Sequence, residues 1–210
     1  MLKIIIDGSA DMPDGWDKKY DFQILPIPIH IGGRTYYNGV DITTDQFYEL
    51  VKMEGNSPKT AAPSPDRIKD FIEKISEVGD TVFSLSVSQK MSSTFAMVQK
   101  AAKEVSDKIK VITFDSGAGS AVLAFMAREV RLRAKAGESI DEIMAALNTL
   151  RDKVMVIMTL DSLEFAHRSG RVGALTKAVT SLLNIKPIVT LHSGVLSVTG
   201  MVRTRKKSLE

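Results

Sequence analysis

The segment from Ser88 to Phe95 holds the side chains best suited to bind an anion. The hydroxyls of Ser92, Ser93 and Thr94 stand at the start of a predicted helix, and Lys90 lies just before it. The segment has no acidic residue to neutralise the positive end of the helix dipole, and free backbone N–H groups at a helix start bind anions. The pattern therefore predicts an anion-binding site, although serines that only cap the helix would give the same local sequence.

The other predicted helix starts are occupied by polar or acidic side chains of the chain itself. Thr43 precedes Gln46, and Ser139 precedes Glu142, with the spacing of a capping box. The residues 64–66, Ser-Pro-Asp, form another good helix start. The contrast favours the helix start described above as the place where an external anion binds.

Three aspartates could support a different chemistry. Asp7 and Asp11 follow the first predicted strand, and Asp115 ends a later one, so all three would lie at the same edge of a parallel sheet. Grouped carboxylates can hold a metal ion, as in a metal-dependent hydrolase or phosphotransferase. The same side chains can instead cap loops by accepting hydrogen bonds. The residues alone leave both alternatives open.

Other signatures of catalysis are absent from the sequence. The residues 117–119, Gly-Ala-Gly, lack the third glycine of a dinucleotide fingerprint, and Ser92 does not lie in a G-x-S-x-G motif. His30, His167 and His192 show no zinc spacing, and the absence of cysteine excludes disulfides and cysteine metal sites. We therefore expect a binding protein that is not itself an enzyme and needs no cofactor or metal.

Composition predicts a soluble, cytoplasmic protein with a substantial core. The 210 residues are 44% hydrophobic and 25% charged, which suits one large or two small domains. The first apolar run, Leu2 to Ile6, is too short for a signal peptide or a membrane span, so no stable membrane insertion is expected. A net charge of +3 does not indicate nucleic acid, although Arg203 to Lys207 is basic. We expect no nucleic-acid partner.

An α/β fold is predicted to position these residues. Strands are predicted at Leu2 to Ile6, Thr81 to Val87 and Lys110 to Phe114, and the polar loops that follow them should gather at one edge of a parallel sheet. The alternating run from Ile24 to Ile31 holds two prolines and is predicted as an edge strand, with a hairpin turn at Gly32-Gly33 after it. Helices are predicted at Thr44 to Met53, Asp66 to Val78, Phe95 to Val105 and Ala121 to Ala134.

A second domain is predicted after a helix that ends near Leu150. We assign residues 1–150 to an α/β domain that carries the anion-binding loops, and residues 151–210 to a partial second α/β domain. The predicted fold class is thus α/β, with a parallel-sheet N-terminal domain and a smaller, incomplete second domain. The second domain should contain strands at Val154 to Met158, Lys186 to Leu191 and Val195 to Thr199, and helical segments at Leu163 to Arg171 and Leu175 to Leu183.

Six segments, in order along essentially the whole chain, carry a family resemblance. They are Asp7 to Pro13, Thr60 to Pro65, Ser88 to Phe95, Ser169 to Arg171, Leu182 to Ile188 and Arg203 to Lys207. The first five resemble the D-S-T-A-D-L-P, T-S-Q-P-S-P, S-S-G-L-S-G-T-Y, G-G-R and L-L-N-I-K-P-I segments of the DegV family, and the last resembles a further segment of it. Together they are far more specific than any one of them.

The resemblance implies that the chain binds a long-chain fatty acid, such as palmitate or stearate, in an apolar tunnel. It implies that the hydroxyls of Thr60 and Ser92 hold the carboxylate with help from the Ser93 N–H group. Arg171 and Arg203 match arginines near the head group and the phosphoryl-transfer step. Some family members present the lipid in a bacterial fatty acid kinase, whose separate ATP-binding subunit phosphorylates the carboxylate. The expected partners are therefore the fatty acid and such a kinase subunit.

The chain departs from the family pattern in the binding loops. Ala61-Ala62 replaces a Ser-Gln pair, Ser93 replaces a glycine, and Lys90 stands where a small residue is usual. A side chain at a glycine position can crowd a ligand or require a different backbone. Ser93 is therefore the departure that bears most on the carboxylate site.

Family members also continue beyond the segment that resembles Arg203 to Lys207, with a histidine associated with phosphoryl transfer. That part does not follow here, so the second domain is expected to be incomplete. An unpaired strand edge and exposed apolar surface are expected near Val189 to Leu191 and Val195 to Val198. We therefore expect self-association, such as a homodimer, and lost or very weak phosphoryl transfer, while some lipid binding persists.

Overall fold

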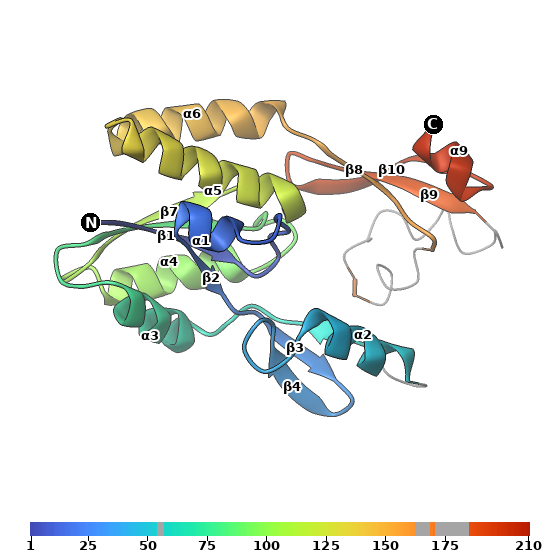
Figure 1. Cartoon of the computed structure of the whole chain (residues 1–210), viewed down its shortest axis with the longest axis horizontal. Helices are drawn as coiled ribbons and strands as arrows, with labels where there is room; N and C mark the ends of the chain where they lie inside the picture. The colour runs from blue at the N-terminus through green and yellow to red at the C-terminus, as the bar shows by residue number, and fades with distance from the viewer. Residues whose placement is uncertain (54–56, 163–168, 171–184) are drawn as a thin grey trace.

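A four-stranded parallel sheet forms the centre of the protein (Figure 1). The computed structural model describes residues 1–53, 57–162, 169–170 and 185–210. The strand order is β2-β1-β6-β7, and all neighbours are parallel. The strands are β1 (Leu2–Asp7), β2 (Phe22–Leu25), β6 (Thr81–Ser86) and β7 (Lys110–Asp115). The predicted α/β class with its parallel sheet is confirmed.

Helices cover both faces of this sheet (Figure 1). One face packs against α3 (Pro65–Ile75) and α4 (Thr94–Glu104); the other packs against α1 (Trp16–Tyr20), α5 (Ser120–Lys135) and α6 (Ile140–Lys153). Because successive strand residues point to opposite faces, Ile4 and Ile6 join the α5 side, whereas Ile5 joins the α3 and α4 side. Burial on both faces explains why β1 reads as one continuous apolar run.

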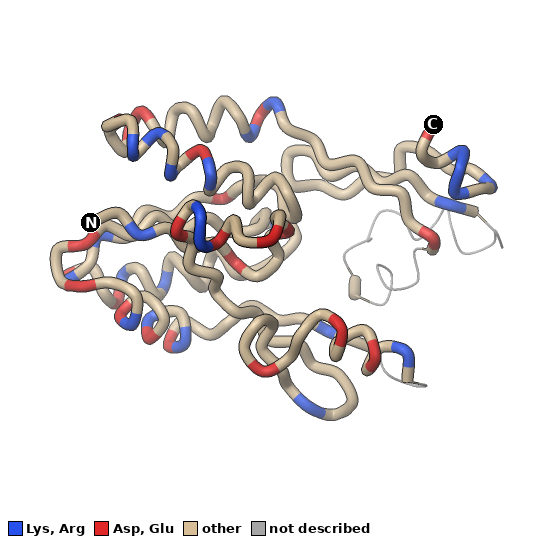
Figure 2. The backbone as a smooth tube through the Cα atoms, viewed as in Figure 1, with Lys and Arg blue, Asp and Glu red and all other residues tan. Residues whose placement is uncertain are grey.

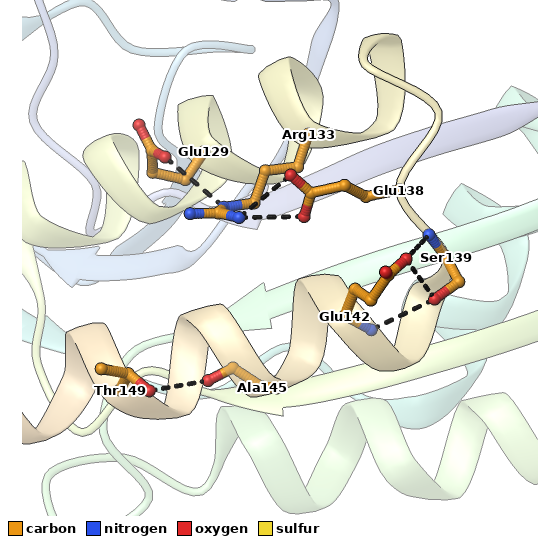
Figure 3. Close-up of polar contacts among 7 residues, drawn as sticks. All are labelled: Glu129, Arg133, Glu138, Ser139, Glu142, Ala145 and Thr149. Atoms are coloured by element: carbon orange, nitrogen blue, oxygen red, sulfur yellow. Dashed lines mark hydrogen bonds and ion pairs between the residues drawn. The ribbon is translucent and has the colours of Figure 1, made fainter.

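Polar contacts stabilise the connection between α5 and α6 (Figure 3). Arg133 of α5 donates two hydrogen bonds to the carboxylate of Glu138, at 2.9 and 3.1 Å. In the adjacent capping box, the Ser139 hydroxyl accepts from Glu142 N, while the Glu142 carboxylate accepts from Ser139 N. The capping box stabilises the first turn of α6, and the Arg133–Glu138 pair joins the end of α5 to the connecting loop.

A second, antiparallel sheet follows β2 in the chain. Its order is β4-β3-β5, made of β3 (Pro28–Ile31), β4 (Arg34–Tyr37) and β5 (Lys59–Thr60), and α2 (Thr44–Lys52) follows β4. The predicted hairpin is confirmed, since Gly32 and Gly33 have φ of +58° and +74° between two paired strands.

The prediction of a single edge strand from Ile24 to Ile31 is wrong. The chain leaves the parallel sheet after Leu25 and enters the second sheet at Pro28. β2 is at an edge, but β3 is the central strand of its sheet. Pro28 is tolerated there because it is the first residue of the strand.

A third sheet, antiparallel and of order β10-β9-β8, extends to one side of the parallel sheet (Figure 1). It contains β8 (Val156–Thr159), β9 (Lys186–His192) and β10 (Val195–Val202), and α9 (Arg205–Leu209) follows it. The predicted strands are confirmed, but Val189 and Leu191 of the central strand are buried, which corrects the expected exposure there. The predicted helical segments at residues 163–171 and 175–183 lie outside the described residues, apart from Ser169 and Gly170.

The predicted helices of the first 150 residues are confirmed, with ends shifted by one to three residues in most cases. Within the described ranges, no helix is both long and apolar enough to cross a membrane. Figure 2 shows basic residues gathered around α9 at the end of the chain, and these are Arg203, Arg205, Lys206 and Lys207.

Candidate functional site

The loop between β6 and α4 brings three hydroxyl groups to one helix start. Two turn hydrogen bonds shape it, because Met91 N and Ser92 N both donate to Ser88 O, at 2.9 and 3.1 Å. Thr94 is buried, Ser92 is half-buried and Ser93 is exposed. The loop therefore presents the hydroxyls of Ser92 and Ser93 on the accessible side of the helix end.

The start of α4 has neither an acidic side chain in its first turn nor a capping bond from the side chain of its N-cap residue, Ser93. The Ser92 hydroxyl instead accepts from Thr94 N at 3.2 Å and lies 2.9 Å from Thr94 Oγ1. Ser92 thus satisfies one N–H group of the helix, and when Thr94 is the donor between the two hydroxyls, the Ser92 proton can be donated to an external acceptor. The capping and anion-binding interpretations are therefore compatible.

The prediction that the other helix starts are occupied by their own side chains is wrong for α5, whose first turn also contains no acidic residue. Its N-cap is Gly119, and no side chain caps it. Ser120 N donates to Ser9 O at 3.1 Å, and the Ser120 hydroxyl donates to Asp11 Oδ2 at 2.7 Å. The fold thus places the carboxylate of Asp11 at the start of α5. The absence of an acidic residue from the first turn therefore does not by itself distinguish α4 from α5.

Asp7 is a buried residue whose carboxylate binds the first residue of the β6–α4 loop, Val87. It is 1% exposed, and its Oδ2 accepts from Val87 N at 2.6 Å. Its Oδ1 accepts from Ser9 N at 3.0 Å and from the Ser9 hydroxyl. Burial raises the pKa of the Asp7 carboxyl from 3.8, while hydrogen bonds from Ser9 and Val87 oppose that increase. Asp7 thus fixes the point at which the chain leaves β6.

Asp115 and Asp11 also stabilise loops. Asp115 Oδ1 accepts from Gln89 N and Gly117 N, both at 3.1 Å, and Asp11 accepts from Ser120. Among the described residues, no three His, Cys, Asp or Glu side chains are grouped so that they could hold a metal ion. The alternative of a hydrolase or phosphotransferase using Asp7, Asp11 and Asp115 around a metal therefore gains no support from the geometry.

The three polar loops do gather at one sheet edge, as predicted. Ser88 N donates to Ala118 O at 2.8 Å, which joins the loops after β6 and β7, and the Asp7 carboxylate joins the loops after β1 and β6. The unpredicted participant is the β9–β10 turn. The Ser88 hydroxyl donates to Gly194 O at 3.3 Å, and the Lys90 ammonium donates to Ser193 O at 3.0 Å.

The remaining predicted site residues come from other parts of the fold. Thr60 lies in β5, opposite Ile29, and is exposed; among the described residues no hydrogen bond links it to Ser92. Arg203 is exposed between β10 and α9. Arg171 lies outside the described residues. Ser92 and Ser93 thus lie at the start of α4 and Thr60 lies in a different sheet, and the binding roles of Thr60, Ser92, Ser93 and the two arginines stay predictions.

A surface hollow of about 720 Å³ lies beside the β3–β4 hairpin. Its lining is polar and basic, with His30, Arg34, Thr35, Ser57 and Lys59 around the backbone of residues 31–33. The ring of His30 is hydrogen bonded to Thr35 at 2.8 Å. Such a lining suits water and polar groups, so this hollow is not a site for an alkyl chain.

The fold and these loops define a class of protein: an α/β protein with a cluster of polar loops at the carboxyl edge of its parallel sheet, where open α/β sheets bind ligands. The sequence matches the DegV family, described as uncharacterised proteins, over residues 1–210, and the chain belongs to that family. The resemblance inferred from six segments is thereby confirmed.

Relatives with known sequences and structures share this fold over nearly the whole chain. A DegV domain-containing protein of Caldanaerobacter subterraneus subsp. tengcongensis is 30% identical over 211 residues, which cover 99% of this chain and 74% of the relative. A stearic acid-binding protein from Eubacterium ventriosum has a TM-score of 0.87 and 27% identity, with 99% of this chain and 73% of that protein covered. A DegV family protein from Thermus thermophilus, described by its fatty acid binding, has a TM-score of 0.86 and 28% identity, with the same coverage.

Proposed function

We propose that this chain binds a long-chain fatty acid such as palmitate or stearate. The observation that carries the proposal is structural similarity over 99% of the chain to proteins described as binding stearic acid or fatty acids, at 27% and 28% identity. The bound molecule would be held by its carboxylate in the loop cluster and by its alkyl chain in an apolar tunnel. Alkyl burial supplies affinity without directional contacts, and the head group sets the orientation.

The start of α4 supports the placement of the carboxylate. A carboxylate beside Ser92 and Ser93 would meet the positive end of the helix dipole, the Ser92 hydroxyl proton and the backbone N–H of Ser93. The exposed hydroxyl of Thr60 would supply a further donor from β5. Charge-assisted hydrogen bonds of this kind are stronger than neutral ones.

The chain is further proposed to present its fatty acid to a separate ATP-binding kinase subunit in the cytoplasm. That subunit would transfer the γ-phosphoryl group of ATP to a carboxylate oxygen, which forms an acyl phosphate and ADP. Arg171 and Arg203 would lie near the head group, where guanidinium groups suit the charge of carboxylate and phosphoryl oxygens. In this proposal the chain itself contributes binding and orientation rather than chemical catalysis.

Pairing of two copies is a further part of the proposal. β10 forms one edge of its sheet, and its residues Val195 and Met201 are 47% and 45% exposed. An edge strand of this kind can pair with a second chain. Light scattering at several protein concentrations would detect a dimer, and a monomer at every concentration would exclude this pairing.

Calorimetric titration of delipidated protein tests the proposed ligand. Palmitate should give saturable binding with one molecule per chain, whereas hexadecan-1-ol, which lacks the carboxylate, should bind more weakly. Magnesium chloride should give no saturable heat if the aspartates only hold loops. Binding of magnesium without binding of palmitate would overturn the proposal in favour of the metal alternative.

Reconstitution with a fatty acid kinase subunit tests the partner separately. With ATP and palmitate-loaded chain, the kinase subunit should form acyl phosphate, which hydroxylamine trapping detects. Palmitate binding without any acyl phosphate would leave the fatty-acid site standing and would reject the kinase partner.

A further inference from the structure

The turn between β9 and β10 contacts the loop that carries Ser92, although the two are distant in sequence. The Ser88 hydroxyl donates to Gly194 O at 3.3 Å across a separation of 106 residues. The Lys90 ammonium donates to Ser193 O at 3.0 Å across 103 residues. The third sheet therefore contacts the start of the proposed head-group loop through the tip of one hairpin.

The fit of this turn is close. Gly194 is buried and has φ of +78°, a backbone conformation that side chains rarely adopt. A β-carbon at this position would collide with the Ser88 hydroxyl oxygen and would lie 3.3 Å from Lys90 Cδ. The space between the turn and the loop thus admits a glycine but no larger residue. The turn is seated against the loop rather than loosely beside it.

Ser88 and Lys90 connect this contact to Ser92. The Ser88 hydroxyl accepts from Lys90 N at 3.2 Å while it donates to Gly194. Ser88 O accepts from Ser92 N at 3.1 Å, so the same residue also sets the position of Ser92. A shift of the turn would therefore move a backbone that is bonded directly to Ser92.

We propose that Lys90 is a positioning residue that ties the β9–β10 turn to the head-group loop and so slows release of the bound fatty acid. The inference rests on the proposed function for the identity of the ligand, whereas the contact between Lys90 and the turn is independent of that function. The sequence suggested that the Lys90 charge would contact the anion itself. In the structure its ammonium instead donates to the backbone carbonyl of Ser193, in the turn of the third sheet. It acts on the ligand through Ser88 and the loop rather than as a direct anion contact.

The expected effect on release is moderate, because Lys90 is exposed and water competes for its hydrogen bond. Replacement by methionine in Lys90→Met keeps most of the aliphatic stem and removes the ammonium. The dissociation rate of palmitate should then rise about threefold to tenfold, which is less than the loss of a shielded hydrogen bond to a charged group would give, because solvent weakens an exposed contact. Lys90→Arg, which keeps a cationic donor, should restore slow release.

The experiment combines dissociation kinetics with amide hydrogen exchange. Radiolabelled palmitate is released from the loaded protein into excess albumin, and exchange is measured at residues 88–93 and 193–195 in the ligand-free protein. Lys90→Met should speed both release and exchange, with little change in melting temperature. Lys100→Met, which removes an exposed lysine of α4, is the matched control and should change neither.

Gly194→Ala provides an independent variant at the other side of the contact. Because it introduces a collision with Ser88, it should speed release and loop exchange at least as much as Lys90→Met. The inference would be overturned if Lys90→Met released palmitate and exchanged its loop amides at the same rates as Lys100→Met. It would also be overturned if Lys90→Met exchanged its loop amides faster but released palmitate at an unchanged rate. If the parent protein binds no palmitate, the proposed function fails, and the exchange comparison alone then decides whether the tie exists.

Discussion

Ser92 is the residue on which the proposed head-group site depends most. Its hydroxyl accepts from Thr94 N and lies 2.9 Å from Thr94 Oγ1, at a helix start with no acidic side chain in the first turn. Thr60 would add a second hydroxyl from β5. Both side chains are small and partly accessible, so neither contributes much to core packing.

Ser92→Ala is expected to weaken palmitate binding substantially. A hydrogen bond to a charged group contributes roughly 1.5–3 kcal/mol, which corresponds to an affinity lower by about tenfold to a hundredfold. Thr60→Ala should act in the same direction. Displacement of a fluorescent fatty acid measures both variants.

Ser106→Ala is the control for these two variants, because Ser106 is exposed just beyond the other end of α4. Its affinity should match the parent protein. Unchanged palmitate affinity in both Ser92→Ala and Thr60→Ala would place the carboxylate elsewhere.

At this scale, the sequence could identify candidates but not their surroundings. The hydroxyls before α4 and the absence of an acid there are visible in the chain. The burial of Asp7 and its bond to Val87 are not visible, because they depend on the pairing of β1 with β6. The direction of the Lys90 side chain also depends on tertiary structure.

The elements of the fold follow local rules in most places. The capping boxes of α2 and α6 and the serine cap of α3 were predicted from spacing alone, and all three are present. The break between β2 and β3 was missed, because strict alternation through Pro26 and Pro28 hides a change of sheet. The helix α1 was also missed, since five residues give too little periodicity to detect.

The capping box of α6 predicts a specific dependence of stability on pH. The Glu142 carboxylate accepts from Ser139 N and from the Ser139 hydroxyl, both at 2.7 Å, and these bonds lower its pKa below 4.5. A carboxylate with a lowered pKa in the folded state stabilises the fold above the unfolded value, and this contribution disappears as pH falls through the folded value.

Glu142→Gln keeps the shape of the capping box but removes the charge. The parent protein should melt at a higher temperature than Glu142→Gln at pH 7, and the difference should shrink toward zero as the pH falls below about 4.5. Thermal unfolding followed by circular dichroism from acidic to neutral pH measures this. Glu104→Gln, at the end of α4, is the control and should not lose a stabilising charge. A difference that is the same at every pH would refute the assignment to Glu142.

The arrangement of the three sheets is the least predictable level of the structure. The order of parallel strands follows from their apolar runs and polar ends, but nothing local indicates that Gly194 contacts Ser88. Such contacts depend on the packing of whole elements that are far apart in sequence. For the same reason the length of a binding tunnel cannot be inferred from the residues of its mouth.

For the whole molecule, the affinity for a fatty acid should depend on its length. Each buried methylene contributes about 0.8 kcal/mol, so the tail can contribute more than the head group. Laurate, four carbons shorter than palmitate, should bind more weakly by about 3 kcal/mol, or roughly a hundredfold, if that part of the tail is enclosed. Calorimetric titration of a series of saturated acids measures this. Equal affinity for octanoate and palmitate would indicate a small-anion site without a tunnel.

Native mass spectrometry of the purified chain tests the central claim most directly. The protein should carry an added mass equal to one long-chain fatty acid, and solvent extraction should release palmitate, stearate or a close relative. The added mass should disappear on delipidation and return when palmitate is supplied. A chain that carries no such mass after purification, and gains none when delipidated protein is incubated with palmitate, would contradict fatty-acid binding by this protein.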